Sequence, residues 1–249
     1  MTPEEIERYA RHIVLREIGG PGQNKLLSAK LLCIGAGGLG SPALLYLAAA
    51  GVGTLGIVDD DKVSLSNLQR QVLHETNAVG EAKTSSAARA LSRVNPNISV
   101  VLHNVRLDEN NVDELIARYD LVLDGTDNFA TRYLVNAACV RAKTPLISAA
   151  MSQWEGQISV YDPANGGPCY QCVFPQAPAE GLAPNCAQAG VMGALAGVMG
   201  SMMAGEAIKL ITGAGQVLHG EILIYDSLYG ETRKLKTSSR TDCPICGVP

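Results

Sequence analysis

The chain has 249 residues, of which 47% are hydrophobic and 18% charged, so it can bury a large core and is not intrinsically disordered. Lys and Arg total 20 against 24 Asp and Glu, and this net charge of −4 argues against a sequence-independent grip on nucleic acid. Seven cysteines in a chain this large indicate thiols used for metal binding or chemistry in a reducing compartment, so we expect a cytoplasmic protein.

Helix signals begin near the N-terminus. The first residues carry acids and no apolar run, so we expect no secretory signal. Thr2 and Glu5 are placed to form a capping box around Pro3, and the helix that they start is expected to run to about Arg16. The run Gly19-Gly20-Pro21-Gly22 is expected to break this helix, and a short helix should follow over residues 23–28.

Strands and helices alternate from residue 31 to about residue 150. The expected strands cover residues 31–34, 54–58, 98–102, 121–124 and 146–148. The expected helices cover residues 41–50, 81–94, 108–118 and 129–142. Such alternation predicts right-handed βαβ units, and therefore an α/β fold with a Rossmann-like, doubly wound and mostly parallel sheet.

The pattern changes past residue 150. A strand over 157–161 is followed by a loop rich in Pro, Gly and Cys, and two strands over 221–225 and 232–236 predict a hairpin. The charge-free stretch from Ala189 to Gly205 is short for a membrane span, so we expect a buried core helix over 191–211 and no membrane partner. We expect a single domain over 1–249, with a nucleotide-binding half (1–150) and a half with antiparallel strands (151–249).

A glycine-rich turn predicts a nucleotide site. Gly35-Ala36-Gly37-Gly38-Leu39-Gly40 has the G-x-G-x-x-G pattern between an expected buried strand and a helix. In this context glycines let the backbone approach phosphates, and the helix N-terminus supplies N–H groups. Asp59, at the end of the second strand, suits a ribose hydroxyl. These two features do not distinguish NAD from ATP.

The next segment favours a triphosphate. Two cations, Arg70 and Lys83, lie in the sequence beside Asp59-Asp60-Asp61, with the amides of Asn67 and Gln69. A triphosphate needs such charge, because negative charge builds on the leaving phosphates, whereas a neutral hydride site does not. Lys83 can equally be a surface lysine of its helix. Asp127, in the segment that closes the fourth strand, can hold Mg²⁺.

Two C-x-x-C pairs predict a structural zinc site. Cys169 and Cys172 form one pair and Cys243 and Cys246 the other, and four thiolates would close a tetrahedral shell with no open position for catalysis. A redox pair at Cys243 and Cys246 is the alternative. Cys186 lies in the loop before a long helix, where its pKa could be lowered for chemistry or where it could have no role.

Together these motifs resemble the ubiquitin-activating-enzyme-like (HesA/MoeB/ThiF) adenylyltransferase family, nearest to the molybdopterin-synthase adenylyltransferases of the MoeB type. The resemblance implies a homodimer in which Arg11 reaches the ATP of the partner subunit. Arg11, Arg70, Lys83 and Asp127 would be catalytic, and in some members a cysteine at the place of Cys186 bonds to the carrier. The resemblance and the motifs give these ATP-binding residues: Gly35, Gly37, Gly38, Gly40, Asp59, Asp61, Ser66, Asn67, Leu68, Gln69, Arg70, Lys83, Asp127 and Asn128.

The implied substrate is a ubiquitin-like sulfur-carrier protein that ends in Gly-Gly. Its terminal carboxylate would attack the α-phosphorus of ATP, releasing pyrophosphate and leaving an acyl-adenylate. A terminal carboxyl has a pKa of roughly 3.3–3.7 and is already ionised at neutral pH, so no general base is needed. Accordingly, the four histidines fall in none of the motifs. The loop over 174–190 would either cover a channel for the carrier tail or serve only as a connection.

Four alternatives stay open. The resemblance to the MoeB type implies that the carrier is the small subunit of molybdopterin synthase, in molybdenum cofactor biosynthesis. The thiamine-pathway carrier (ThiF type) fits the same motifs. An NAD-dependent oxidoreductase would use the glycine turn and Asp59 but leaves the cations unexplained. A non-catalytic scaffold should have lost the nucleotide residues, and a tRNA-modifying relative is disfavoured by the acidic balance and the two cysteine pairs.

Overall fold

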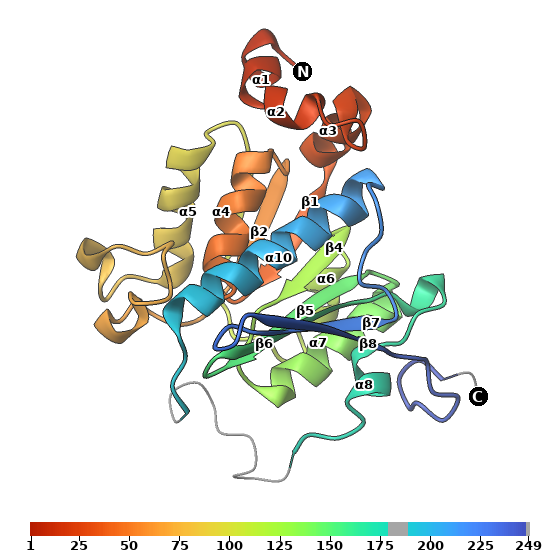
Figure 1. Cartoon of the computed structure of the whole chain (residues 1–249). Coiled ribbons are helices and arrows are strands. Elements are labelled where there is room, and N and C mark those ends of the chain that lie inside the picture. Colours follow the sequence, from red (N-terminus) through yellow and green to blue (C-terminus); the bar gives the residue numbers. More distant parts are fainter. Residues whose placement is uncertain (179–188, 248–249) are drawn as a thin grey trace.

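The computed structural model describes residues 1–178 and 189–247, and in this part eight strands form one sheet in the order β3-β2-β1-β4-β5-β6-β7-β8 (Figure 1). The strands from β3 to β5 pair in parallel, and β5 to β8 pair antiparallel. The predicted mixed sheet with antiparallel C-terminal strands is thus confirmed. Its strands are β1 (Lys30–Ile34), β2 (Thr54–Val58), β3 (Ser99–His103), β4 (Leu121–Asp124), β5 (Leu146–Ser152), β6 (Glu155–Tyr161), β7 (Glu221–Asp226) and β8 (Glu231–Lys236).

Helices cover both faces of the parallel part. Helices α4, α5 and α10 share one hydrophobic cluster with the sheet, and α6 and α7 share the other. The helices are α1 (Pro3–Arg8), α2 (Ala10–Ile13), α3 (Gly19–Ser28), α4 (Gly40–Ala50), α5 (Lys83–Val94), α6 (Val112–Ile116), α7 (Phe129–Ala142), α8 (Tyr170–Val173) and α10 (Gly193–Thr212). Short 3₁₀ turns are η1 (Leu65–Asn67), η2 (Thr76–Ala78) and η3 (Pro163–Asn165).

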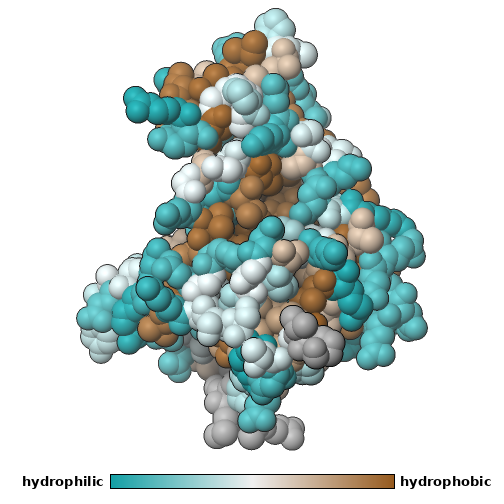
Figure 2. All heavy atoms as spheres, turned by 90° about the vertical axis from the view of Figure 1, so that its right-hand side faces the viewer, coloured by the Kyte–Doolittle hydropathy of each residue, from teal (hydrophilic) through white to brown (hydrophobic). Residues whose placement is uncertain are grey.

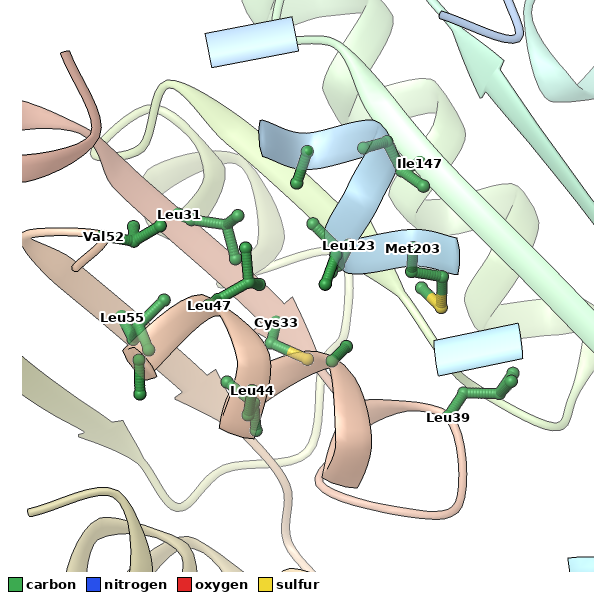
Figure 3. Packing of buried hydrophobic residues seen from close by; sticks show 14 of the residues in the cluster. Leu31, Cys33, Leu39, Leu44, Leu47, Val52, Leu55, Leu123, Ile147 and Met203 are labelled. Atoms are coloured by element: carbon green, nitrogen blue, oxygen red, sulfur yellow. The ribbon is translucent and has the colours of Figure 1, made fainter. Parts of the chain in front are cut away.

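The central strand β1 shows why the sheet is covered on both sides. Successive residues of a strand point to opposite faces. Leu31 and Cys33 pack with α4 and α10, whereas Leu32 and Ile34 pack with α6 and α7, and all four are at most 3% exposed. Figure 3 shows the first cluster, in which Leu47 of α4 lies beside Leu31. An apolar run without alternation is therefore buried on both faces, as expected of a parallel strand.

The N-terminal helices differ from the prediction. The capping box of Thr2 and Glu5 is confirmed, with Thr2 N donating to Glu5 Oε2 at 2.7 Å and Glu5 N to Thr2 Oγ1 at 3.2 Å. The single helix to Arg16 is wrong, because the chain bends at Tyr9, whose ring is 2% exposed and whose hydroxyl accepts a hydrogen bond from Asn95 at 2.8 Å. The expected break at residues 19–22 is also wrong, since these residues form the first turn of α3, where a proline is tolerated.

Helix α10 lies across the sheet. By length and composition it is the one helix among the described residues that could span a membrane. It instead packs against α4, β5 and α3, and Leu195, Met199 and Met203 are fully buried. The prediction of a core helix is confirmed. Elsewhere the predicted helix over 108–118 is shorter than expected, and the loop after β6 contains η3 and α8.

Candidate nucleotide site and cysteine cluster

The glycine-rich turn connects the end of β1 to the start of α4. Gly35 has a φ of +93°, a left-handed conformation that glycine adopts without strain. A Cβ placed on Gly40 would lie 1.9 Å from the carbonyl oxygen of Gly35, so only glycine fits there. The backbone N–H groups of Gly37 and Gly38 donate to no acceptor within residues 1–178 and 189–247. Free N–H groups at a helix N-terminus form an anion site, so the predicted geometry of the turn is present.

Asp59 and Lys83 meet beside this turn. Asp59 accepts hydrogen bonds from Ala36 N and Asp61 N, both at 2.9 Å. Lys83 Nζ lies 2.8 Å from Asp61 Oδ2 and 3.8 Å from Asp59 Oδ1. Burial raises the pKa of the Asp59 carboxyl, and the nearby Lys83 ammonium opposes this shift. Lys83 is only 6% exposed, so the alternative of a surface lysine is wrong.

Arg70 and Gln71 lie over the turn from the segment after η1. Asn67 caps η1 by accepting from Ser64 N, and Arg70 Nη1 donates to the carbonyl of Ser66 at 3.1 Å. The Cγ of Arg70 lies 3.6 Å from where a Cβ on Gly38 would be. Gln71 is 5% exposed, faces Gly37, and its Oε1 is buried without a partner among the described residues. Sequence reasoning did not select Gln71, although it follows Arg70 directly.

Four residues of the predicted nucleotide set make local structural contacts. Gln69 lies against Gly193 at the start of α10, since a Cβ placed on Gly193 would lie 2.3 Å from the carbonyl oxygen of Gln69. Leu68 N donates to Leu65 O at 3.2 Å and ends η1. The Ser66 hydroxyl pairs with that of Ser64, and Asn128 caps α7 by accepting from Thr131 N at 2.9 Å. A place for these four residues in the nucleotide site stays a prediction.

A buried network holds the loop after β4. The Asp124 carboxylate accepts hydrogen bonds from Thr126 N at 2.9 Å and from the Ser148 hydroxyl at 3.0 Å. Arg132, 6% exposed, donates to Ser148, to Ala149 O and to Thr126 O. The exposed carboxylate of Asp127, next in the loop, accepts no hydrogen bond from any described residue. Such a free oxygen donor suits Mg²⁺. The sequence did not predict the network beside Asp127, because its side chains come from three different elements.

Arg11 lies at the opposite end of the sheet. It is an exposed residue of α2, and Tyr9 beside it packs against Gly51 at the end of α4. Gln23 of α3 donates to Ala50 O at 2.8 Å. The N-terminal helices therefore lie where the parallel strands begin, whereas the glycine turn lies where β1 ends (Figure 1). Arg11 does not meet the other predicted nucleotide residues of its own chain.

The two C-x-x-C pairs come together. Cys169 Sγ lies 3.9 Å from Cys172 Sγ and 3.7 Å from Cys243 Sγ, and Cys172 Sγ lies 3.3 Å from Cys246 Sγ. All four sulfur atoms are within 4.8 Å of one another and none is in a disulfide. Tetrahedral zinc with Zn–S bonds of about 2.3 Å separates its sulfur ligands by about 3.8 Å, so the donor set and its spacing fit zinc. Cys186 lies outside the described residues.

Comparisons with known proteins agree with this geometry. The sequence profile of the ThiF family matches residues 9–245. The sulfur carrier protein adenylyltransferase of Thermus thermophilus is 46% identical over 99% of this chain and 92% of its own. The SAMP-activating enzyme E1 of Haloferax volcanii is 46% identical over 98% of this chain and 89% of its own. The probable adenylyltransferase/sulfurtransferase MoeZ of Mycobacterium tuberculosis is 50% identical over 92% of this chain, which covers 59% of MoeZ.

Solved structures show the same fold. The crystal structure of E. coli MccB with MccA-N7isoASN has a TM-score of 0.86 and 25% identity, and the match covers 97% of this chain and 75% of that chain. The structure of E. coli MccB with ATP has a TM-score of 0.81 and 26% identity over 92% of this chain and 70% of that chain. The profile match and the relatives named adenylyltransferases show that this chain belongs to the ThiF family and is a nucleotidyltransferase.

Proposed function

We propose that this enzyme uses ATP to adenylylate the C-terminal Gly-Gly carboxylate of a ubiquitin-like sulfur-carrier protein. The observation that carries the proposal is the pair of N–H groups, on Gly37 and Gly38, that donate to no described residue and lie beside Arg70 and the buried Lys83. Such donors suit phosphates. The name of the T. thermophilus relative, sulfur carrier protein adenylyltransferase, supports the carrier as substrate.

The chain's own residues would bind and align two anions. The N–H groups of the turn and the Arg70 and Lys83 side chains would hold the phosphates, and Asp59 would accept a hydrogen bond from a ribose hydroxyl. The carrier carboxylate then attacks the α-phosphorus, and pyrophosphate leaves. Because that carboxylate is already ionised, the residues need to supply alignment and charge neutralisation rather than a base.

Asp127 is the proposed Mg²⁺ ligand. Its exposed carboxylate is held at the end of β4 by the Asp124 and Arg132 network, on the side where doubly wound sheets bind ligands. When bound there, Mg²⁺ would neutralise charge on the phosphates. The residues present therefore fit this cofactor.

The small subunit of molybdopterin synthase is the proposed carrier, and the thiamine-pathway carrier is the alternative. The test is pyrophosphate–ATP exchange in the presence of each purified carrier. We expect exchange that depends on the molybdopterin-synthase subunit and that is lost when its terminal glycine is deleted. Exchange with the thiamine carrier alone would replace the carrier assignment, whereas no exchange with any Gly-Gly carrier would overturn the proposed function.

We further propose that the four clustered cysteines bind a structural zinc ion. The cluster joins α8 to the C-terminal segment through Cys243, which is 4% exposed. Backbone and amide groups support the thiolates, since Arg240 N donates to Cys172 Sγ at 3.4 Å and Asn136 Nδ2 to Cys169 Sγ at 3.7 Å. In this proposal residues 1–249 act as one domain, in which 151–249 provide the zinc site and the carrier-binding half.

We also propose a homodimer in which Arg11 completes the partner subunit's nucleotide site. Two observations support it. Val14 and Leu15, just beyond Arg11, are 74% and 47% exposed, and Figure 2 shows an apolar recess below the N-terminal helices. Helix α10 also presents a strip of small residues, and added Cβ atoms at Gly197 and Gly205 would meet nothing within 4 Å. Exposed apolar surface of this kind marks interaction sites.

Mixing two inactive variants tests the dimer. Neither R11A nor D127A should adenylylate a carrier alone. A mixed dimer has one site with both residues intact, so random exchange of subunits should restore about a quarter of the wild-type activity. No recovery after verified subunit exchange would place Arg11 outside the partner's site, and a monomer by light scattering would exclude the dimer.

A further inference from the structure

His74 is a buried residue that the proposed mechanism does not use. It lies in the segment between η1 and η2 and is 6% exposed. Its Nε2 lies 2.9 Å from the carbonyl oxygen of Ala36, in the glycine-rich turn, and its Nδ1 lies 3.0 Å from the hydroxyl of Ser86, on α5. The imidazole therefore joins the turn to the helix that carries Lys83.

The two contacts fix which nitrogen carries the proton. A carbonyl oxygen only accepts hydrogen bonds, so Nε2 must donate to Ala36 O. In the neutral ring Nδ1 is then an acceptor, and the Ser86 hydroxyl donates to it. Burial lowers the pKa of His74, which favours this neutral form.

Ala36 is consequently held on both sides. Its N–H donates to Asp59 Oδ2 at 2.9 Å, and its carbonyl accepts from His74 at 2.9 Å. The peptide between Ala36 and Gly37 is planar and trans, so its C=O and N–H point in opposite directions. A carbonyl directed at His74 leaves the Gly37 N–H directed away from His74, and that N–H donates to no described residue.

We propose that His74 is a positioning residue for nucleotide phosphate: it fixes the direction of the Gly37 N–H through the Ala36 carbonyl. It touches neither substrate nor reacting atoms in this role. The inference rests on the proposed binding of ATP at the glycine turn. It does not depend on which carrier is adenylylated.

Three variants at this position separate the hydrogen bond from the packing. In H74Q the side-chain amide can place its nitrogen near the original Nε2, so the bond to Ala36 O can be kept. In H74N the shorter amide reaches only the Nδ1 side and Ser86. H74F keeps a ring of similar size without a donor. We expect ATP affinity to fall roughly 10- to 100-fold in H74F and H74N, the range for loss of a hydrogen bond to a charged group, and to stay within about threefold of wild type in H74Q.

Adenosine serves as the probe that carries no phosphate. Its affinity should be unchanged in all three variants, because the Gly37 N–H would contact only phosphate. The measurement is titration calorimetry of the full-length protein with ATP and with adenosine, together with the thermal unfolding midpoint. Equal losses for ATP and adenosine, or an H74F protein that binds ATP like wild type, would overturn the inference. Wild-type protein that binds ATP but supports no carrier-dependent exchange would instead overturn only the proposed function.

Discussion

The Lys83 ammonium lies 2.8 Å from the Asp61 carboxylate, at the first turn of α5. The lysine side chain is 8% exposed, whereas that of Asp61 is 69% exposed. Asp61 therefore contacts the ammonium from the solvent side, and water screens the attraction between the two charges. The second acid, Asp59, is buried with the lysine and lies 3.8 Å away. An ammonium has three N–H donors, and among the described residues Lys83 donates one hydrogen bond, to Asp61, so donors remain for an anionic ligand beside the glycine turn.

We therefore expect Lys83→Met to abolish most ATP-dependent activity. Loss of a charge-assisted contact to phosphate in a partly buried site should lower kcat/KM for ATP at least about 100-fold. The change also leaves the Asp59 carboxylate without its nearest cation, so its pKa should rise further and the unfolding midpoint should fall.

The matched control is Arg89→Met on the same helix. Arg89 pairs with Glu81 at 2.9 Å, but both side chains are more than 40% exposed, so the cost should be below about 1 kcal/mol and activity should be unchanged. Equal activity of the two variants in pyrophosphate exchange would contradict the role given to Lys83.

Asp127→Ala should remove activity without affecting the fold. The carboxylate is exposed and accepts no hydrogen bond from the described residues, so the free energy of unfolding should stay within about 0.5 kcal/mol of wild type. Pyrophosphate exchange should be lost. Asp113→Asn, an exposed acid paired with Arg141 on α7, is the control and should exchange normally. Normal exchange by the Asp127 variant would sink the assignment.

Glycine substitutions should separate packing from ligand binding within the turn. Gly40→Ala places a methyl group 1.9 Å from the Gly35 carbonyl, so the backbone must shift and stability should fall by several kcal/mol. Gly37→Ala meets nothing closer than the Gln71 amide at 3.7 Å, so the protein should fold. Its ATP affinity should nevertheless fall, since the backbone at this glycine is expected to approach the phosphates. Urea unfolding and ATP titration of both variants check this, and an unchanged midpoint for Gly40→Ala would contradict it.

The sequence predicts the strands of the parallel part of the sheet well, because local patterns encode them, whereas α6 is shorter than predicted. The apolar run at 31–34 and the boundary at Phe129–Ala142 match the structure closely. The prediction of one N-terminal helix was wrong at Tyr9. The Tyr9 ring is buried against Asn95 and Gly51, which lie far away in sequence. Tertiary contacts of this kind override helix propensity.

The same contrast holds at the site. The turn, Asp59 and the cysteine pairs carry recognisable spacings, so they could be selected from sequence. Hydrogen bonds join His74 to Ala36 and Ser148 to Asp124, and no motif in the sequence links these residues. The contacts that the structure shows for Ser66, Leu68, Gln69 and Asn128 are local caps and turns or a contact with α10, so their role at the nucleotide stays a prediction.

Removal of zinc should destabilise the C-terminal segment. We expect one zinc ion per chain by atomic absorption, and loss of this ion in Cys243→Ser should lower the unfolding midpoint, since metal binding and folding are coupled. Cys139→Ala is the control, because Cys139 is buried in a separate cluster with α6 and the sheet. Wild-type protein without zinc, or a Cys243 variant that retains it, would contradict the structural zinc site.

Two histidines, the buried His74 and the half-buried His103, should make stability fall in mild acid. Burial lowers the pKa of His74 and of His103, whose Nε2 lies 2.8 Å from the Tyr119 hydroxyl. Below the ordinary value of 6.5 the unfolded chain then binds more protons than the folded chain, so the free energy of unfolding decreases as pH falls below about 6.5. Above about pH 7.5 both rings are neutral in the folded and the unfolded chain, so they do not change the free energy of unfolding with pH. Urea unfolding between pH 8 and pH 5 should show a smaller loss for the H74Q/H103Q double variant than for wild type, and parallel curves would refute the assignment. Acid release of zinc affects both proteins alike, so the difference between the curves reports the two histidines.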